Sequence, residues 1–485
     1  MRRPRFAYFW LLAAMGTLAA WPMILLSRLG MPHNVPLLSW RPAALFPSSP
    51  ALLVDNISWS YAVGLITLLL AMILTDVVRA SDSDWWTWAA GMTLSGLGIS
   101  AIMGGNLLTL MIAWAAIDLV DLAILITQVN QYCDRERSVL SLSLRGMGIF
   151  FLLAGGLAGE WFLFAAVLRS GILPLHIHES REMPRWRSFR TISSLVSTST
   201  SMMLLSRLDY SQVESKNGPI LLALAGLTAA YAGLSWVNAR DEQYGRPFWI
   251  LGMTALCFAA TIEGKPEASL ALGMATILPG GLILLSSSRQ GTLGAILLLG
   301  LIGFSSLPYT PTWPAGALFA FPLNFWQILL LLGHAMLLTG YIRHGLNRGA
   351  SLSGLERWVW IIYPWGLVLL PLTHFLVGWW SFIESGRFIV GQSPLAGAIP
   401  SAISIVLAGL LVLISHRGIP VSARLANVAA SVFSLEWFYR TLRYAYRSLN
   451  QLVAFTTIVL ESEGGVLWAF LLLTLLLAFF MQGGP

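Results

Sequence analysis

The chain has 485 residues, of which 56% are hydrophobic and only 11% are charged, and its formal net charge is +7. A mean hydropathy of +0.73 excludes an ordinary water-soluble domain. Apolar stretches long enough to cross a hydrocarbon core of about 30 Å recur along the whole chain. The positive charge alone would also suit a nucleic-acid-binding protein, but membrane topology explains it better, so no nucleic acid partner is expected.

We predict about fifteen membrane-spanning segments and no separate soluble domain. Each span is expected to be an α-helix, because lipid offers the backbone of a non-barrel chain no hydrogen-bond partners. The predicted fold class is therefore an all-α polytopic membrane protein embedded in the lipid bilayer. The predicted spans are 7–27, 57–78, 86–103, 105–128, 139–157, 160–177, 191–208, 218–237, 247–262, 268–286, 292–308, 318–342, 358–380, 395–415 and 465–482.

The basic residues alternate between loops in a way that predicts the orientation. With the N-terminus in the cytoplasm, 22 of the 29 Lys+Arg residues lie on the cytoplasmic side, among them Arg187 and Arg289, and six lie on the other side, among them Arg207. This count assigns Arg145 to a cytoplasmic loop and leaves Arg169 as the only cation inside the membrane. The bias follows the positive-inside rule. Together with the predominance of arginine over lysine, it suggests a prokaryotic plasma membrane.

One long segment breaks the rhythm of helices and short loops near the C-terminus. We therefore divide the chain into a membrane domain (1–416), a polar segment (417–464) and a terminal span (465–485). The polar segment has the three-to-four-residue apolar spacing of an amphipathic, interfacial helix. It could rest on lipid headgroups, or it could brace or dock a partner. Its apolar stripe comprises Leu435, Phe438, Leu442, Tyr446 and Leu449.

No soluble-type active site can be built from this sequence. It has no Walker loop, dinucleotide fingerprint, CxxC, HExxH or nucleophile elbow. We expect no cofactor and no metal site, and no catalysis by the chain alone. The candidates for function are therefore ionisable groups inside the membrane, which are rare there and usually functional.

Asp118, Asp121 and Arg169 are the principal candidates. The two aspartates are three residues apart and share a helix face with Trp114. Two neighbouring carboxylates in a low dielectric would repel if both were ionised, unless a cation intervened. Arg169 can supply that cation, so we expect it to pair with Asp118 or Asp121. The pair could be a structural lock between helices or one station of a proton path.

The histidines in or beside apolar segments are weaker candidates. His176, His178 and Glu179 could form an interfacial polar cluster, and a metal site there is less favoured because His176 and His178 point to different helix faces. His334 and His374 are lone histidines in apolar helices. Each could be a packing residue or a proton relay, because histidine titrates near neutral pH.

Several of these segments resemble the antiporter-like subunits of respiratory complex I and the related Mrp-type transporters. The similarity runs unevenly from about residue 50 to 320. The short C-terminal polar segment before a last span also resembles a family member that has a lateral helix there. The matching stretches are Leu52–Ala62, Asn106–Trp114, Ala165–His176, Leu195–Thr200 and Phe304–Pro308. The resemblance implies two inverted repeats with broken helices, a central polar axis and flat contacts with other membrane subunits.

The residues that carry proton transfer in that family are replaced here. Ala115 stands at the family's glutamate position, with Asp118 one turn later as the candidate substitute. Arg169 stands at the lysine position and Ser197 at a histidine position. In the second half, Ala275 and Pro279 replace a histidine and a lysine. A later family lysine has no counterpart near Ala315–Phe319. Since arginine does not release a proton as lysine does, the resemblance implies a weakened or lost pump.

Three functions remain open from the sequence. The leading hypothesis is a membrane subunit of a complex I-related assembly, such as an NADH:quinone oxidoreductase, with weakened or lost proton pumping. The second is the membrane half of a two-component inorganic-carbon uptake system, whose subunits share this fold. The third is a purely structural scaffold. All three require protein partners, and none places a quinone or an electron donor on this chain.

Overall fold

The computed structural model describes most of the chain in fourteen stretches. It describes residues 3–37, 48–79, 85–128, 132–155, 159–170, 187–208, 217–289, 292–320, 323–347, 349, 356–384, 397–416, 436–461 and 468–474. The chain divides into two compact units, Met1–Ala430 and Ser431–Pro485, which are considered separately below.

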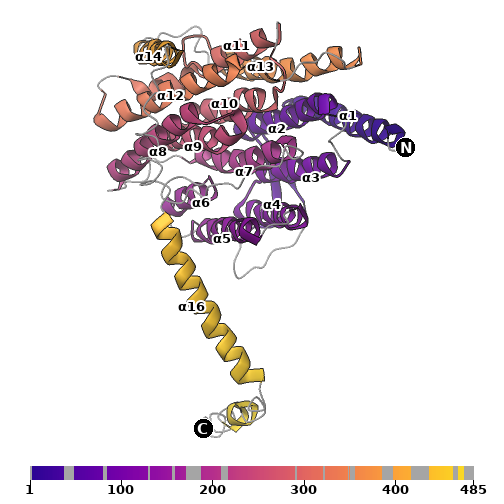
Figure 1. The fold of residues 1–485 in the computed structure, drawn as a ribbon, viewed down its shortest axis with the longest axis vertical. Coiled ribbons are helices and arrows are strands. Elements are labelled where there is room, and N and C mark those ends of the chain that lie inside the picture. The colour runs from indigo at the N-terminus through magenta and orange to yellow at the C-terminus, as the bar shows by residue number, and fades with distance from the viewer. Residues whose placement is uncertain are drawn as a thin grey trace. The chain divides into compact units, whose positions relative to one another are not determined.

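Helices dominate both units (Figure 1). The α-helices of the first unit are α1 (Arg3–Leu26), α2 (Asn56–Thr75), α3 (Trp85–Ile102), α4 (Leu107–Gln128), α5 (Tyr132–Ala154), α6 (Glu160–Ser170), α7 (Arg187–Arg207), α8 (Gly218–Asn238), α9 (Glu242–Ile262), α10 (Pro266–Leu285), α11 (Thr292–Phe304), α12 (Phe325–Leu346), α13 (Val359–Glu384) and α14 (Ala398–His416). The described residues of this unit also include two 3₁₀ helices, η1 (Asp76–Arg79) and η4 (Trp313–Phe319).

The first unit is built around a few helices that are apolar on all sides. In the most apolar windows of α2, α9 and α10, 89%, 89% and 94% of the residues are buried, against 17% in α1. Figure 1 shows α4, α5 and α6 on one side of the unit and α11, α13 and α14 on the opposite side. A helix that is hydrophobic all round is stable only inside a protein or a bilayer. The helices α2, α9 and α10 therefore form the interior of this unit.

The all-α membrane class predicted from the sequence is confirmed. Eight helices of the described residues are long and apolar enough to cross a membrane, and three shorter apolar helices accompany them. The helices α1 to α14 follow the predicted spans from 7–27 to 395–415 in order. The last span, 465–482, lies mostly outside the described residues. The number of fifteen spans and the inverted repeats stay predictions.

One predicted span ends early and is followed by an irregular segment. The sequence predicts spans at 292–308 and 318–342, but α11 ends at Phe304 and α12 begins at Phe325. Between them, Ser306 and Tyr309 have positive φ angles of 57° and 65°, which side chains other than glycine seldom adopt. Pro308 and Pro311 lie in this segment and lack the N–H that would continue a helix. We call residues 305–312 the α11–η4 break.

The Pro-rich segment that follows α1 contains the two described strands. Strands β1 (His33–Pro36) and β2 (Ala51–Val54) pair antiparallel, with His33 opposite Val54 and Pro36 opposite Ala51. Helical spacing could not have predicted this pair. The strand β2 also holds Gly105, whose N–H bonds to the carbonyl of Ala51, so the pair fixes the start of α2 relative to the turn before α4.

The second unit contains α16 (Glu436–Glu461) and a helical turn region at 468–474. Within its own unit, α16 exposes large apolar side chains at three-to-four-residue spacing, including Tyr446, Leu449 and Val453, alongside Arg440 and Arg447. Residues 417–435, including Leu435 of the predicted stripe, lie outside the described residues. The described helix is amphipathic in sequence and has an apolar face that its own unit does not bury.

Asp55 ties the beginning of α2 to the end of α7. Its carboxylate accepts a hydrogen bond from the Ser58 N–H at 2.7 Å and caps the helix. It also accepts from Arg207 Nη2 at 3.1 Å and 3.2 Å. Burial alone would raise the pKa of Asp55, but the Ser58 N–H and the Arg207 charge outweigh it and hold that pKa below its ordinary value.

We expect the charge of Asp55 to stabilise the fold at neutral pH. Because the folded-state pKa is lowered, the stabilisation is present above the unfolded pKa of about 3.9 and is lost as the pH falls through the folded value. Asp55→Asn keeps a good helix cap and removes the charge, whereas Asp55→Ala also removes the cap at about 0.5–2 kcal/mol. Thermal unfolding in detergent at several pH values measures both.

The comparison of wild type with Asp55→Asn isolates the contribution of the Asp55 charge to stability. Wild type should exceed Asp55→Asn in stability at pH 7, and the two should converge in acid. An equal gap at both pH values would show that the Arg207 contact contributes no charge-dependent stability.

Candidate functional site

Asp118 and Arg169 form a bidentate ion pair between two apolar helices. Arg169 lies at the end of α6 and Asp118 in the middle of α4. Arg169 Nη1 donates to Asp118 Oδ2 at 2.7 Å, and Nη2 donates to Oδ1 at 2.9 Å. The two side chains are 0% and 4% exposed. A planar guanidinium matches a carboxylate in this fork geometry, which holds both groups in one orientation.

A second arginine neutralises the second aspartate. Arg145 Nη1 lies 2.7 Å from Asp121 Oδ2 and 3.7 Å from Asp118 Oδ1, so it bridges the two acids. Ser193 of α7 donates its hydroxyl to Asp121 as well. Because Asp121 thus receives both Arg145 and Ser193, helices α4, α5, α6 and α7 are joined at one point. We call Asp118, Asp121, Arg145 and Arg169 the Asp118 cluster.

The position of Arg145 corrects the sequence analysis. Arg145 is not in a loop, and Arg169 is not the only cation at this depth: Arg145 lies within the apolar helix Leu142–Ala154, and its side chain is only 20% exposed. The signal was available, because residue 145 falls inside the span predicted at 139–157. In sequence, however, an arginine near the end of a span cannot be told from loop charge.

Trp114 completes the environment of Arg169. The Arg169 Cζ lies 4.6 Å from the centre of the Trp114 ring, one turn before Asp118 on α4. The ring face attracts the guanidinium, and this interaction strengthens when water is excluded. Arg169 Nε finds no acceptor among the described residues. The indole therefore holds the cation without removing its charge.

This arrangement favours a fixed ion pair over a proton-transfer site. The cluster has two carboxylates and two guanidiniums, so its formal charges cancel. A guanidinium keeps its protons at physiological pH, and its paired N–H donors hold a carboxylate in one orientation. Asp118 and Asp121 each have an arginine partner that keeps its own charge.

The other predicted polar residues do not join the Asp118 cluster. Ser197 lies one turn beyond Ser193 on α7, and its hydroxyl has no partner among the described residues. His176, His178 and Glu179 lie outside the residues that the structure describes. The described residues contain no group of three metal-ligating side chains. The site on α4–α7 is therefore made of Asp118 and its partners, with Ser197 as a neighbouring unpaired hydroxyl.

His334 and His374 lie elsewhere, beside the end of α11. His334 of α12 contacts the Phe304 carbonyl through Nε2 at 3.3 Å and the Ser404 hydroxyl through Nδ1 at 3.2 Å. His374 of α13 is 1% exposed, and neither of its ring nitrogens has a partner among the described residues. The structure thus brings these two histidines to one end of one helix, which the sequence did not predict.

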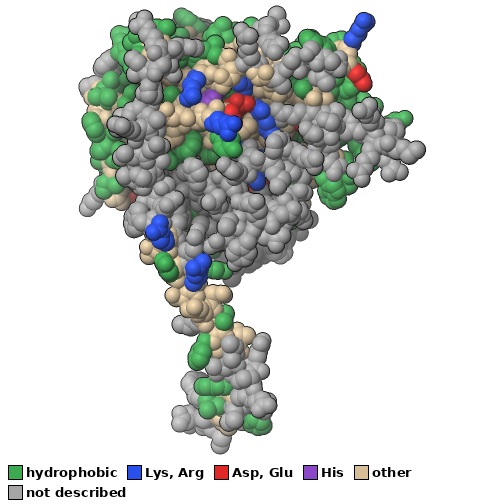
Figure 2. All heavy atoms as spheres, in the orientation of Figure 1, with side chains coloured by type: hydrophobic (Ala, Val, Ile, Leu, Met, Phe, Trp, Pro, Cys, Tyr) green, Lys and Arg blue, Asp and Glu red, His purple; other side chains and the backbone are tan. Residues whose placement is uncertain are grey.

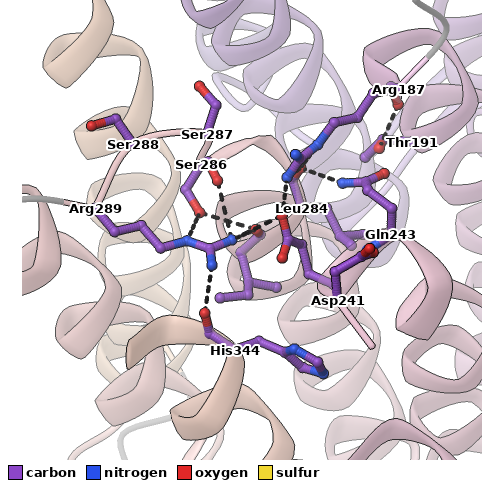
Figure 3. Close-up of polar contacts among 12 residues, drawn as sticks. Arg187, Thr191, Asp241, Gln243, Leu284, Ser286, Ser287, Ser288, Arg289 and His344 are labelled. Atoms are coloured by element: carbon purple, nitrogen blue, oxygen red, sulfur yellow. Dashed lines mark hydrogen bonds and ion pairs between the residues drawn. The ribbon is translucent and has the colours of Figure 1, made fainter. Parts of the chain in front are cut away.

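A second charged cluster joins α7, α9 and the α10–α11 connection (Figure 3). Glu242 Oε1 accepts from Arg187 and lies 3.2 Å from Arg289 Nη2. Arg187 and Arg289 approach the Leu284 region from opposite sides, and Arg187 and Gln243 both donate to the Leu284 carbonyl. Charged side chains gather over α9 and α10 on the face drawn in Figure 2. We call Arg187, Glu242 and Arg289 the Glu242 cluster.

The Glu242 cluster is a structural lock at the ends of three helices. Arg289 has a side chain only 2% exposed and donates to Ser286 and to the carbonyls of Ile283 and His344. Its donors therefore satisfy carbonyls left open where α10 and α12 end. In sequence both arginines are predicted to lie in loops on one side, and nothing there indicates that a single glutamate joins them.

The Asp118 pair should couple strongly in a mutant cycle. Asp118→Leu alone leaves a buried guanidinium uncompensated and should cost about 3–5 kcal/mol. The double variant Asp118→Leu/Arg169→Met replaces the pair by apolar groups and should recover most of that loss. Thermal unfolding of the four proteins in one detergent measures the coupling. Additive losses would mean that the two side chains do not depend on each other.

Known proteins are similar to this chain in structure and not in sequence. No protein-family model matches the sequence, and no curated protein matches it. Solved membrane complexes do match. A chain of the membrane-bound sulfane sulfur reductase (MBS), an archaeal respiratory membrane complex, is similar with a TM-score of 0.67 at 13% identity, over 96% of this chain and 95% of that one.

Two further structures give the same result. A chain of the Mrp complex from Dietzia sp. DQ12-45-1b has a TM-score of 0.66 at 13% identity, over 99% of this chain and 62% of that one. A chain of respiratory complex I from Thermus thermophilus has a TM-score of 0.57 at 17% identity, over 82% of this chain and 95% of that one. The chain therefore shares its fold with chains of the MBS, Mrp and complex I assemblies, in agreement with the resemblance of its sequence to complex I and Mrp membrane subunits.

Proposed function

We propose that this chain is an antiporter-like membrane subunit of a multi-subunit respiratory assembly, in which the Asp118 cluster replaces a proton-transfer site with a fixed ion pair. The observation that carries the proposal is the bidentate contact of the fully buried Arg169 guanidinium with Asp118. The resemblance of the sequence to the family's lysine helix gives that contact its meaning. A titratable amine is expected at this position, and a permanent cation occupies it.

The electrostatics support a loss of proton translocation through this cluster. Lysine can lose its proton when its surroundings change, because its ammonium pKa shifts readily on burial. Arginine does not release its proton at physiological pH, so Arg169 cannot pass a proton to Asp118. For the same reason Arg145 cannot pass a proton to Asp121. Proton translocation by this half of the chain is expected to be weak or absent.

Membership of a larger assembly is supported by the full-length fold similarity. The matched chains of MBS, Mrp and complex I belong to complexes, and this chain covers 95% of the matched MBS chain. We propose other membrane subunits as its partners. The exposed apolar face of α16 is the proposed interfacial or lateral element, which would lie against lipid or a neighbouring subunit.

The proposed topology places the N-terminus in the cytoplasm of a prokaryotic cell, with about fifteen spans. The ion pairs that the arginines form with acidic residues support this assignment. Arg187 and Arg289, both predicted to be cytoplasmic, share Glu242. Arg207, predicted to be on the other side, contacts Asp55 at the beginning of α2. Residues assigned to the same side therefore meet.

The experiment separates assembly from translocation. The tagged wild-type chain and the Asp118→Leu/Arg169→Met variant would be purified in mild detergent, their partner subunits identified by mass spectrometry, and the complexes reconstituted in liposomes with a pH-sensitive dye. Both should retain the same membrane partners, and proton translocation should be equal, since the pair is proposed to hold helices together and not to carry protons.

Two outcomes would contradict the proposal. Intact assembly with translocation abolished in the double variant would place the cluster on the proton path. A large soluble zinc protein as the main partner, without other membrane subunits, would favour the inorganic-carbon alternative. A control is Arg207→Met, which removes a partly buried arginine that contacts a different aspartate, Asp55, outside the Asp118 cluster.

A further inference from the structure

Two outer helices, α1 and α13, leave large apolar side chains uncovered in the part of the chain that the structure describes. Both helices pack against the buried α2. On α1 the small side chains of Ala13, Ala14 and Thr17 are buried, whereas large side chains are exposed. The spans Tyr8–Leu26 and Val359–Trp380 contain no Asp, Glu, Lys or Arg. We call the exposed sides of α1 and α13 the α1–α13 face, which includes Leu11, Leu12, Met15, Leu18, Ile361, Trp365, Leu372 and Leu376.

A row of aromatic rings joins the first residues of α3, α1 and α13. The Trp85 ring stacks on Trp86 at a centroid distance of 4.1 Å and on Phe9 at 6.0 Å. Trp10, the neighbour of Phe9, lies 5.7 Å from Trp358, which directly precedes α13. Trp10 is buried and donates its indole N–H to a carbonyl of α2 at 2.8 Å, and the other four rings are exposed. We call these five residues the first aromatic row.

A second row lies at the other ends of α1 and α13. The Arg28 Cζ, just past α1, lies 4.3 Å from the centre of the Trp59 ring and 5.0 Å from that of Trp380. The faces of both rings attract the guanidinium. Next to Trp380, Trp379 donates its indole N–H to the Tyr309 carbonyl in the α11–η4 break at 2.9 Å. We call Arg28, Trp59, Trp379, Trp380 and Tyr309 the second aromatic row.

The separation of the two rows matches the hydrocarbon core of a bilayer, which is about 30 Å thick. Phe9 and Arg28 are nineteen residues apart, or about 28 Å at the helical rise of about 1.5 Å per residue. Trp358 and Trp380 are 22 residues apart, or about 33 Å by the same rise. Tryptophan and tyrosine gather at the two boundaries of a membrane, because each has an apolar ring and a polar N–H or O–H.

The residue types on this face favour lipid over a neighbouring subunit as its partner. Interfaces between membrane helices are enriched in small residues, which let two backbones approach closely. The helix α14 offers a contrast: Ala402 is exposed, a Cβ at Gly409 would meet nothing within 4 Å, and the helix contains no Phe, Tyr or Trp. The α1–α13 face instead presents mainly long side chains between two rows of rings, which suits flexible acyl chains.

We propose that the α1–α13 face contacts phospholipid in the assembled complex, with acyl chains between the two aromatic rows and headgroups at the rows, and that no subunit docks there. The proposal rests on the proposed membership of an assembly and restricts the subunit contacts of this chain to its other faces. It also fixes a depth in the bilayer. Leu18 lies midway between Phe9 and Arg28, and Leu372 is the exposed residue nearest the middle of the α13 stretch.

Spin labelling of the purified assembly in liposomes tests the proposal. Labels are attached at Leu12→Cys, Leu18→Cys and Met23→Cys, all on exposed positions of α1, in a chain whose native cysteines are changed to alanine. Oxygen concentrates among acyl chains, whereas a charged nickel complex stays in water. The ratio of collisions with oxygen to collisions with nickel should be several-fold higher at Leu18 than at His33→Cys, the exposed reference outside the spans, and should fall from Leu18 toward both rows.

The isolated chain and the assembly should give the same profile. A loss of oxygen collisions at Leu18 on assembly would show that a subunit covers the face, and a profile without a maximum near Leu18 would place the membrane elsewhere; either result overturns the proposal. A second measurement needs no substitution: a phospholipid with a photoreactive diazirine in its acyl chain should crosslink to α1 and α13 of the wild-type assembly, and absence of crosslinks to both would also overturn it. Purification without partner subunits would instead contradict the proposed function, which is a distinct result.

Discussion

A guanidinium cannot be left alone in a low-dielectric interior, and the organisation of α4 to α7 follows from that constraint. The desolvation of one ion costs several kcal/mol even after relaxation, and it is recovered only with well-oriented partners. Arg169 obtains them from Asp118 and Trp114, and Asp121 then needs Arg145 and Ser193. One buried charge thereby requires contributions from four helices.

The same principle operates at the Glu242 cluster, with a different result. There the arginines satisfy carbonyls where helices end, and a single glutamate lies between them. The Asp118 cluster balances charges within apolar helices, whereas the Glu242 cluster ties helix ends together. Both use arginine, whose five donors can satisfy several acceptors at once. A side chain that takes up and releases protons near neutral pH must be a weaker base than arginine, so the arginines of these clusters do not act in that way.

The sequence was sufficient for the class of fold and for the Arg169–acid contact, and insufficient for its surroundings. Long apolar runs predict membrane helices because the backbone has no alternative in lipid, and Arg169 stands out as a charge within such a run. Arg145 was missed because an arginine near the end of a span resembles loop charge in sequence, although residue 145 falls inside the span predicted at 139–157. Ser193 was missed because a serine among many serines carries no signal until the fold shows which one faces Asp121.

Long-range pairings were beyond the sequence for a related reason. His334 and His374 are forty residues apart, and only the packing of α12 and α13 against α11 brings them to one end of that helix. The sequence does not tell whether a polar residue in an apolar helix has a structural or a functional role, and only its partners in the fold can show this.

The balance of two acids and two arginines also decides how the first half of the chain responds to a membrane voltage. Moving one elementary charge through 100 mV is worth about 2.3 kcal/mol, which is enough to displace a lone arginine. A cluster whose charges cancel experiences almost no net force from the same field. Helices α4 to α7 are therefore expected to keep their arrangement when the voltage across the membrane changes.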